Sequence, residues 1–148
     1  MSATSPPESS SPAPDAAESP FASHADRSSS NRLDAFHAYR DRMNERILEG
    51  TDHLGIKRFF RLDDAAYDDG ALSGDTKELL GLVASAVLRC NDCIDYHLQQ
   101  CVDAGWSDEE LLDALNVALV VGGSIVIPHL RHAVETIDLL RSREQAER

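Results

Sequence analysis

The spacing of the apolar residues constrains the fold of this chain more than any other feature of its sequence. From Leu33 onward these residues recur every three or four positions, and the series begins with Phe36, Tyr39, Met43 and Ile47. This spacing places them on one face of a helix. No stretch alternates apolar and polar residues for long enough to predict a strand. The sequence therefore predicts an all-α fold.

Turn and capping residues divide the pattern into about five to six helices. The first ends near Gly50, and a short second helix covers Ile56–Leu62. Ser73 is a good N-cap for a third. That helix, Asp75–Leu88, is apolar nearly all round, which predicts a buried helix.

Capping and turn residues also mark the ends of the helices predicted in the last part of the chain. Ser107 and Glu110 have the spacing of a capping box, which predicts a helix start. The Gly122-Gly123 pair predicts its end, and a last helix runs from about Ile125 to Arg143.

The N-terminal stretch has a different composition. Residues 1–31 hold ten serines, five of the six prolines and almost no large apolar side chains. Such a segment buries too little surface to offset the entropy of ordering. We expect a disordered Ser/Pro-rich tail over 1–31 and one helical domain over 32–148.

Charge and hydropathy narrow the class of protein. The net charge of −12 argues against nucleic-acid binding, which needs a basic face. The longest apolar stretch, Leu115–Ile127, is too short to span a bilayer, and the N-terminus lacks the basic start and apolar run of a secretory signal. We expect a soluble, cytoplasmic protein without membrane contact, in which cysteines are more often catalytic or metal-binding than structural.

The candidate site centres on Cys90, Cys93 and His97. Their offsets of three and four residues place them on one face of one helix. At a helix start, unpaired N–H groups and the helix dipole stabilise a thiolate. Cys101 lies about 12 Å from Cys93 at ~1.5 Å per residue, and we expect it to be a core residue outside the site.

Glu78 is a carboxylate within an apolar helix. The chain is expected to reverse near residues 89–91, and two antiparallel helices then bring Glu78 level with the segment from His97 to Cys101. A carboxylate beside an imidazole orients it, and the imidazole can serve a thiol as a base. This arrangement predicts an orienting group, a base and a nucleophile on two adjacent helices.

The same residues allow other interpretations. Glu78 can be half-exposed or paired with Arg89. Cys90, Cys93 and His97 can also be three zinc ligands. The candidates for a fourth ligand are His129, His132 and a water molecule. Outside the zinc interpretation, we expect these two histidines to be packing or surface residues.

The spacing Glu78, eleven residues, Cys90-Asn91-Asp92-Cys93, three residues, His97 resembles the alkylhydroperoxidase D-like branch of the carboxymuconolactone decarboxylase family. The segment 104–111 looks like that family's turn and third helix, and the Gly122-Gly123 pair is similar as well. The resemblance covers about residues 33–142.

The resemblance implies an all-helical homo-oligomer, a hexamer first and a trimer next, with no cofactor and no metal. It implies a hydroperoxide reductase in which Cys93 is oxidised by peroxide and Cys90 resolves the product. Glu78 and His97 would form a proton relay. A dithiol of protein or lipoyl type would supply electrons.

Some members of the family place a histidine where this chain has Asp92. A negative neighbour raises the pKa of a thiol. The resemblance therefore implies either a slower first step or a different electron donor. Helix-start chemistry alone favours Cys90 as the more acidic thiol. The alternatives are a decarboxylase-like enzyme, whose branch of the family typically lacks the cysteine pair, and a redox-sensing or zinc-binding module without enzymatic activity.

Overall fold

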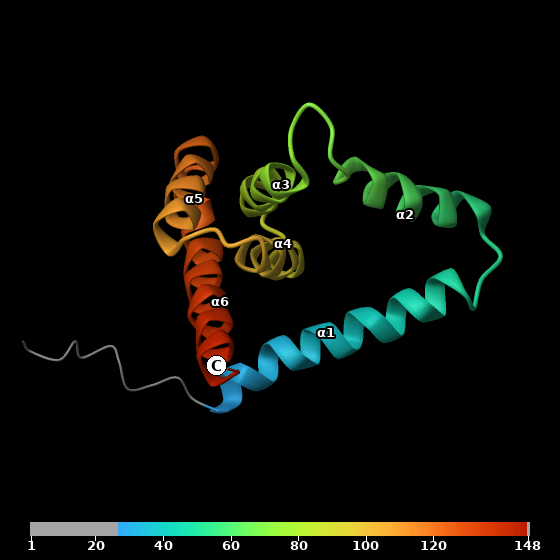
Figure 1. Cartoon of the computed structure of the whole chain (residues 1–148), viewed down its shortest axis with the longest axis horizontal. Coiled ribbons are helices and arrows are strands. Elements are labelled where there is room, and N and C mark those ends of the chain that lie inside the picture. The colour runs from blue at the N-terminus through green and yellow to red at the C-terminus, as the bar shows by residue number, and fades with distance from the viewer. Residues whose placement is uncertain (1–26, 148) are drawn as a thin grey trace, which may run out of the picture.

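The computed structural model describes residues 27–147, with side chains from Arg32 onward, and this range is all-helical, as predicted. Its elements are α1 (Arg27–Leu48), α2 (Leu54–Ala66), α3 (Gly74–Leu88), α4 (Asn91–Asp103), α5 (Asp108–Gly122), the 3-10 turn η1 (Ser124–Val126) and α6 (Ile127–Ala146) (Figure 1). Within this range no helix combines the length and the apolar character needed to cross a membrane. Most of the predicted N-terminal tail, residues 1–26, lies outside the described part of the chain. The expected boundary at residue 31 is wrong, because residues 27–31 already belong to α1.

Helices α1 and α2 form an arm that extends away from the other helices (Figure 1). α1 leaves the body beside α6, and α2 returns from the far end of α1 toward α3. No residue of α2 is fully buried within this chain, and Phe59 and Leu62 are exposed. The arm is therefore held to the body mainly at its two ends.

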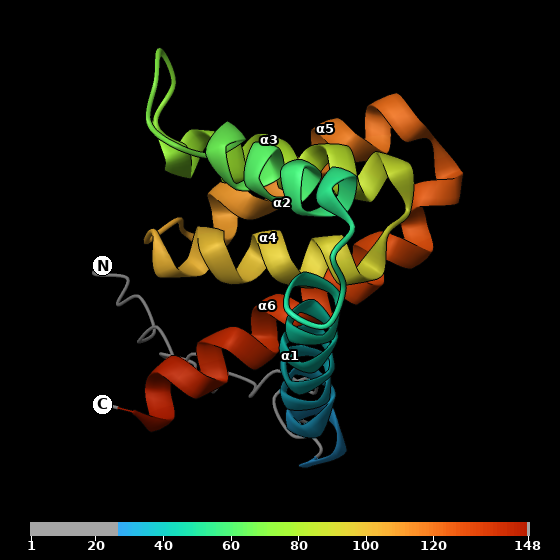
Figure 2. The ribbon, with the colours of Figure 1, turned by 90° about the vertical axis from the view of Figure 1, so that its right-hand side faces the viewer.

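The predicted chain reversal between α3 and α4 is confirmed. Arg89 adopts the left-handed conformation, with φ of 63°, and its backbone N–H bonds to the carbonyl of Ala86. The N–H of Cys90 bonds to the carbonyl of Ser85, so the last turn of α3 is satisfied by the residues that turn the chain. Helices α3 and α4 then lie side by side and run in opposite directions (Figure 2).

The predicted helix starts at Ser73 and Ser107 are also confirmed. The Ser73 side chain accepts the N–H of Thr76. Ser107 and Glu110 form the full capping box, with the Ser107 N–H donating to the Glu110 carboxylate over 2.8 Å.

The core lies between α3, α4, α5 and α6, with Leu33 of α1 added at its edge. The expectation that α3 is buried all round is wrong for the single chain, because only one face of α3 meets α4 and α5. Leu80 and Leu88 are 54% and 75% exposed. Exposed valines on α5, notably Val120 at 76%, extend the apolar surface of the chain.

Candidate active site

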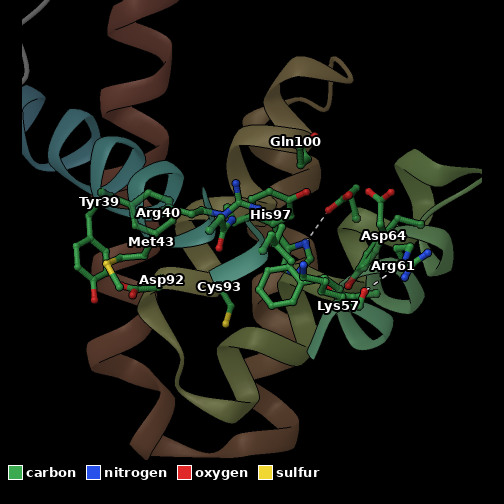
Figure 3. A pocket seen from close by; sticks show the side chains of 18 of the residues that line it. Tyr39, Arg40, Met43, Lys57, Arg61, Asp64, Asp92, Cys93, His97 and Gln100 are labelled. Atoms are coloured by element: carbon green, nitrogen blue, oxygen red, sulfur yellow. Dashed lines mark hydrogen bonds and ion pairs between the residues drawn. The ribbon is translucent and has the colours of Figure 1, made fainter. Parts of the chain in front are cut away.

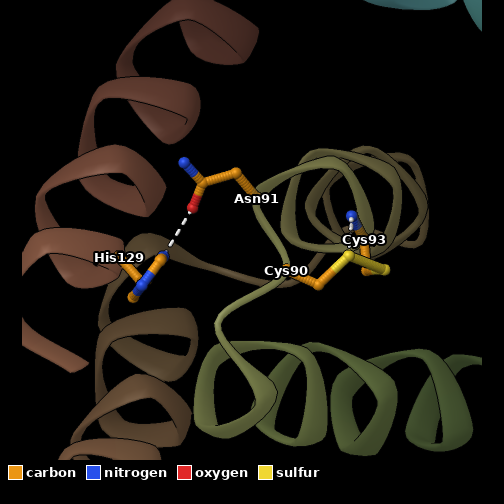
Figure 4. Close-up of a disulfide and its surroundings, with 4 residues drawn as sticks. All are labelled: Cys90, Asn91, Cys93 and His129. Carbon is orange, nitrogen blue, oxygen red and sulfur yellow. Dashed lines mark hydrogen bonds between the residues drawn. A yellow bond between two sulfur atoms is a disulfide. The ribbon is translucent and has the colours of Figure 1, made fainter. Parts of the chain in front are cut away.

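The two cysteines lie at the start of α4, as predicted. Cys90 is the N-cap residue and Cys93 lies in the first turn, with their Cα atoms 5.3 Å apart and their sulfur atoms joined in a disulfide (Figure 4). The Sγ of Cys90 accepts the backbone N–H of Cys93 over 3.3 Å. When the pair is reduced, these first-turn amides favour a thiolate over a thiol.

The antiparallel packing of α3 and α4 brings Glu78 beside His97, also as predicted. The Nδ1 atom of His97 lies 2.6 Å from Oε2 of Glu78, and the two side chains are only 10% and 12% exposed. Glu78 therefore pairs with His97, whereas Arg89 is an exposed residue at the end of α3. Because an ionised carboxylate only accepts hydrogen bonds, Nδ1 donates to Glu78, and Nε2 is the ring nitrogen left to exchange a proton.

Cys93 and His97 open onto the same cleft, which has a volume of about 1040 Å³ (Figure 3). The arm forms one wall of the cleft, and α3 and α4 form the other. The lining combines aromatic and aliphatic side chains with charged ones: Phe36, Tyr39, Met43, Phe60, Tyr67 and Tyr96 with Arg40, Lys57, Arg61, Asp63, Asp64 and Asp92. Such a cleft admits a small molecule with an apolar portion to Cys93.

Three lining residues contact the histidine or its neighbours and were missed in the sequence. Tyr67, at the end of α2, and Tyr96, in α4, have their ring centres 5.4 and 5.2 Å from that of His97. The guanidinium of Arg40 in α1 lies 4.3 Å from the centre of the Tyr96 ring. Only Tyr96 had a local signal, because it directly precedes His97 in a helix.

The remaining candidate residues lie outside this cluster. Cys101 is fully buried in the core, where burial raises the pKa of its thiol to about 12. His129 bonds through Nδ1 to the side chain of Asn91 over 2.7 Å. Among residues 32–147, no three or more histidine, cysteine, aspartate or glutamate side chains are grouped as metal ligands, so the alternative zinc site at Cys90, Cys93 and His97 is not formed there.

A second polar cluster, also missed, surrounds the buried carboxylate of Asp95. Arg32 Nη1, Thr136 Oγ1 and His132 Nε2 donate to its oxygens over 2.7, 2.6 and 2.9 Å. Burial alone would raise the pKa of Asp95, but the hydrogen bonds and the charges of His132 and Arg32 together lower it. The cluster joins α1, α4 and α6 on the side of α4 away from His97, so His132 has a structural place in the fold.

The fold and the site together define an all-helical protein with a cysteine pair at a helix start and a carboxylate–histidine pair beside it. The chain belongs to the carboxymuconolactone decarboxylase family, whose model matches residues 56–136.

Solved structures of family members resemble the chain over most of its described length. A family member from Thermotoga maritima, for which involvement in an antioxidative response has been suggested, has 55% identity and a TM-score of 0.73, covering 76% of this chain and 95% of that one. A family member from Legionella pneumophila, solved in its apo form, has 27% identity and a TM-score of 0.60 over 79% of this chain and 97% of its own. An uncharacterised protein of the cox locus of Paracoccus denitrificans is 28% identical over 80 residues, which are 54% of this chain and 72% of that protein.

Proposed function

We propose that this protein is a thiol-dependent hydroperoxide reductase of the alkylhydroperoxidase D-like branch. The observation that carries the proposal is the shared cleft: Cys93, Glu78 and His97 all line it. His97 lies one helical turn after Cys93 on the same face of α4, so an acid–base group and a nucleophile face the same bound molecule. The antioxidative role suggested for the Thermotoga maritima relative agrees with this chemistry.

In the first step, His97 accepts the proton of the Cys93 thiol, and the thiolate attacks one oxygen of the hydroperoxide. The O–O bond breaks, and the leaving alkoxide takes the proton back from the imidazolium to give an alcohol. Glu78 stabilises the imidazolium between these two transfers. Cys93 is then a sulfenic acid.

In the second step, the sulfur of Cys90 attacks the sulfur of Cys93. The S–S bond forms, the S–O bond breaks, and the hydroxide leaves with the Cys90 proton as water. One hydroperoxide has then been reduced by two electrons from two thiols. The resulting disulfide joins the two residues that are bonded in the structure, and a dithiol donor of protein or lipoyl type returns it to the reduced form by exchange.

We further propose that the chain acts as a cytoplasmic homo-oligomer, with a hexamer favoured and a trimer next. A reducing compartment supports thiol exchange. The exposed apolar residues of α3 and α5 form a surface that a monomer would leave in water.

The decisive experiment counts thiols in reduced, full-length protein before and after stoichiometric hydroperoxide. We expect two thiols per chain to be lost and Cys101 to remain, because its thiol is buried and protonated. Cys93→Ser should abolish turnover, and Cys90→Ser should leave a sulfenic acid at Cys93 that a sulfenate probe labels.

Other outcomes favour the alternatives. Thiol oxidation without catalytic turnover, in the presence of dithiol donors, would indicate a redox sensor. Decarboxylation of a cyclic acid by the Cys93→Ser variant would indicate the decarboxylase activity. Stoichiometric zinc in the freshly purified protein would contradict a free redox pair.

Replacement of Glu78 by Gln tests the relay. The amide keeps the shape of the side chain but cannot stabilise an imidazolium, so we expect turnover to fall by about 10²-fold, the usual effect of losing acid–base assistance. Steady-state kinetics measure the loss, and thermal melting verifies the fold. Glu109→Gln, at an exposed carboxylate of α5, is the control and should turn over as the wild type does.

A further inference from the structure

The imidazole of His97 is enclosed by more than its partner Glu78. The Tyr96 ring meets it edge-on at an interplanar angle of 71°, and the Tyr67 ring lies tilted at 38°. His97 as a whole is only 8% exposed. Two aromatic side chains therefore shield the histidine from water.

The backbone of α3 closes a further side at Gly81. A Cβ atom built at this position would lie 2.6 Å from Cε1 of His97 and 2.8 Å from each ring nitrogen. No side chain fits there without displacing the ring, because carbon atoms pack at about 3.5–4.0 Å. Gly81 follows Glu78 by three residues, so one face of α3 supplies both the carboxylate and the surface against which the ring lies.

The arm completes this enclosure from outside the helical body. Tyr67 is the C-cap residue of α2, and Arg40 of α1 lies against Tyr96. α2 has no fully buried residue of its own, and the half-buried Tyr67 at its end contacts the ring of His97.

Tyr67 and Tyr96 affect His97 through their rings and not through their hydroxyl groups. Burial, followed by the nearby charge of Glu78, raises the pKa of both hydroxyls, so both are neutral at physiological pH. The charged groups that face the enclosure are Glu78 on α3, Arg40 on α1, and Asp63 and Asp64 on α2.

We propose that Tyr67 is a positioning residue for His97, through which the α1–α2 arm holds the histidine in line with Glu78 and keeps water from their hydrogen bond. The effect on turnover rests on the hydroperoxide reductase function proposed above. The effect on the hydrogen bond itself does not. Docking of the arm would thus be a condition for a working relay.

Tyr67→Phe and Tyr67→Ala in the full-length protein separate the ring from the hydroxyl. We expect Tyr67→Phe to keep turnover within about 2-fold. Tyr67→Ala should lower kcat by about 10-fold or more, since a small misplacement of a catalytic group has effects up to about 10², and should shift the pH profile of kcat. Leu62→Ala, which removes an exposed apolar side chain elsewhere on α2, should behave as the wild type.

A second measurement does not depend on activity. The Nδ1–H proton of His97, assigned by its loss in His97→Ala, should give a proton resonance protected from solvent exchange. We expect its exchange to be at least about 10-fold faster in Tyr67→Ala than in Tyr67→Phe, because water reaches the hydrogen bond. If Tyr67→Ala does not fold, Tyr67→Leu keeps apolar volume without the flat ring and serves in its place.

The two proposals fail separately. If the wild type reduces hydroperoxide but Tyr67→Ala matches Tyr67→Phe in kcat, pH profile and exchange rate, the positioning role of Tyr67 is wrong. If the wild type reduces no hydroperoxide, the function is wrong, and the exchange measurement alone decides for or against the positioning role.

Discussion

The carboxylates of Glu78 and Asp95 are both shielded from solvent, but they have different roles in this chain. Glu78 has one partner, His97, and opens onto a cleft. Asp95 is 3% exposed, accepts hydrogen bonds from three side chains and does not line that cleft. A shielded carboxylate that faces a cleft and can still accept hydrogen bonds is suited to proton transfer. A carboxylate whose oxygens already accept several hydrogen bonds stabilises the fold instead.

Replacement of Asp95 by Asn tests this structural role. The amide cannot pair with Arg32 in the same way, and we expect a loss of about 1.5–3 kcal/mol in the free energy of unfolding at pH 7, the range for hydrogen bonds to charged groups. Folding lowers the pKa of Asp95. Its contribution is therefore present above the unfolded pKa of about 3.9 and is lost as the pH falls through the folded pKa.

Chemical denaturation at pH 7 and near pH 3 measures both effects. The difference between wild type and Asp95→Asn should shrink at the lower pH. Asp138→Asn, at an exposed position of α6, should change little at either pH. An equal loss at both values would show that the charge of Asp95 is not what stabilises the fold.

At the scale of elements, the helix starts carry both stability and chemistry. Ser73 and Ser107 satisfy first-turn amides with hydroxyl oxygens, whereas α4 begins with the sulfur of Cys90. A thiol sulfur is a weak acceptor. The amides at the start of α4 are thus less fully satisfied and remain available to stabilise a thiolate.

The capping box of α5 gives a prediction for an ordinary helix start. We expect Ser107→Ala to lower stability by about 1 kcal/mol, the typical value of an N-cap side chain, and the melting temperature by about 4 °C for a domain of this size. Differential scanning calorimetry measures the change. Ser142→Ala, where the hydroxyl donates to the carbonyl of Asp138 within α6, is the matched control, and an equal effect there would contradict a capping origin.

At the scale of the whole molecule, the single chain leaves apolar helix faces in water. Val117, Val120 and Val121 share one exposed face of α5, and Leu80 and Leu88 share one of α3. These side chains would be buried by association with other copies, which agrees with the proposed oligomer.

Light scattering with and without a charge at this surface tests the assembly. We expect the wild type to have the mass of a hexamer or trimer at micromolar concentration. Val120→Glu should reduce that mass, because a carboxylate buried without a partner is costly. Ala71→Glu, in the exposed loop before α3, should assemble normally. A monomeric wild type would contradict the proposal.

The sequence by itself determined the all-helical class, the starts of α3, α4 and α5, and the pairing of Glu78 with His97. Capping and the 3.6-residue period are local rules, and two straight helices joined by a tight turn have a register set by the rise per residue. The chain reversal predicted near residues 89–91 was therefore enough to place the carboxylate of Glu78 beside the imidazole of His97.

Only the tertiary structure decided what surrounds that pair. Tyr67 contacts His97, and Arg40 contacts Tyr96, because the arm of α1 and α2 lies across the cleft from α4. No local sequence pattern encodes the angle between the arm and α4. Arg32 likewise meets Asp95 across 63 residues of sequence. Contacts of this kind depend on how whole helices pack. The exposed face of α3 makes the same point: the spacing of apolar residues identifies an apolar helix face, but not the element that covers it.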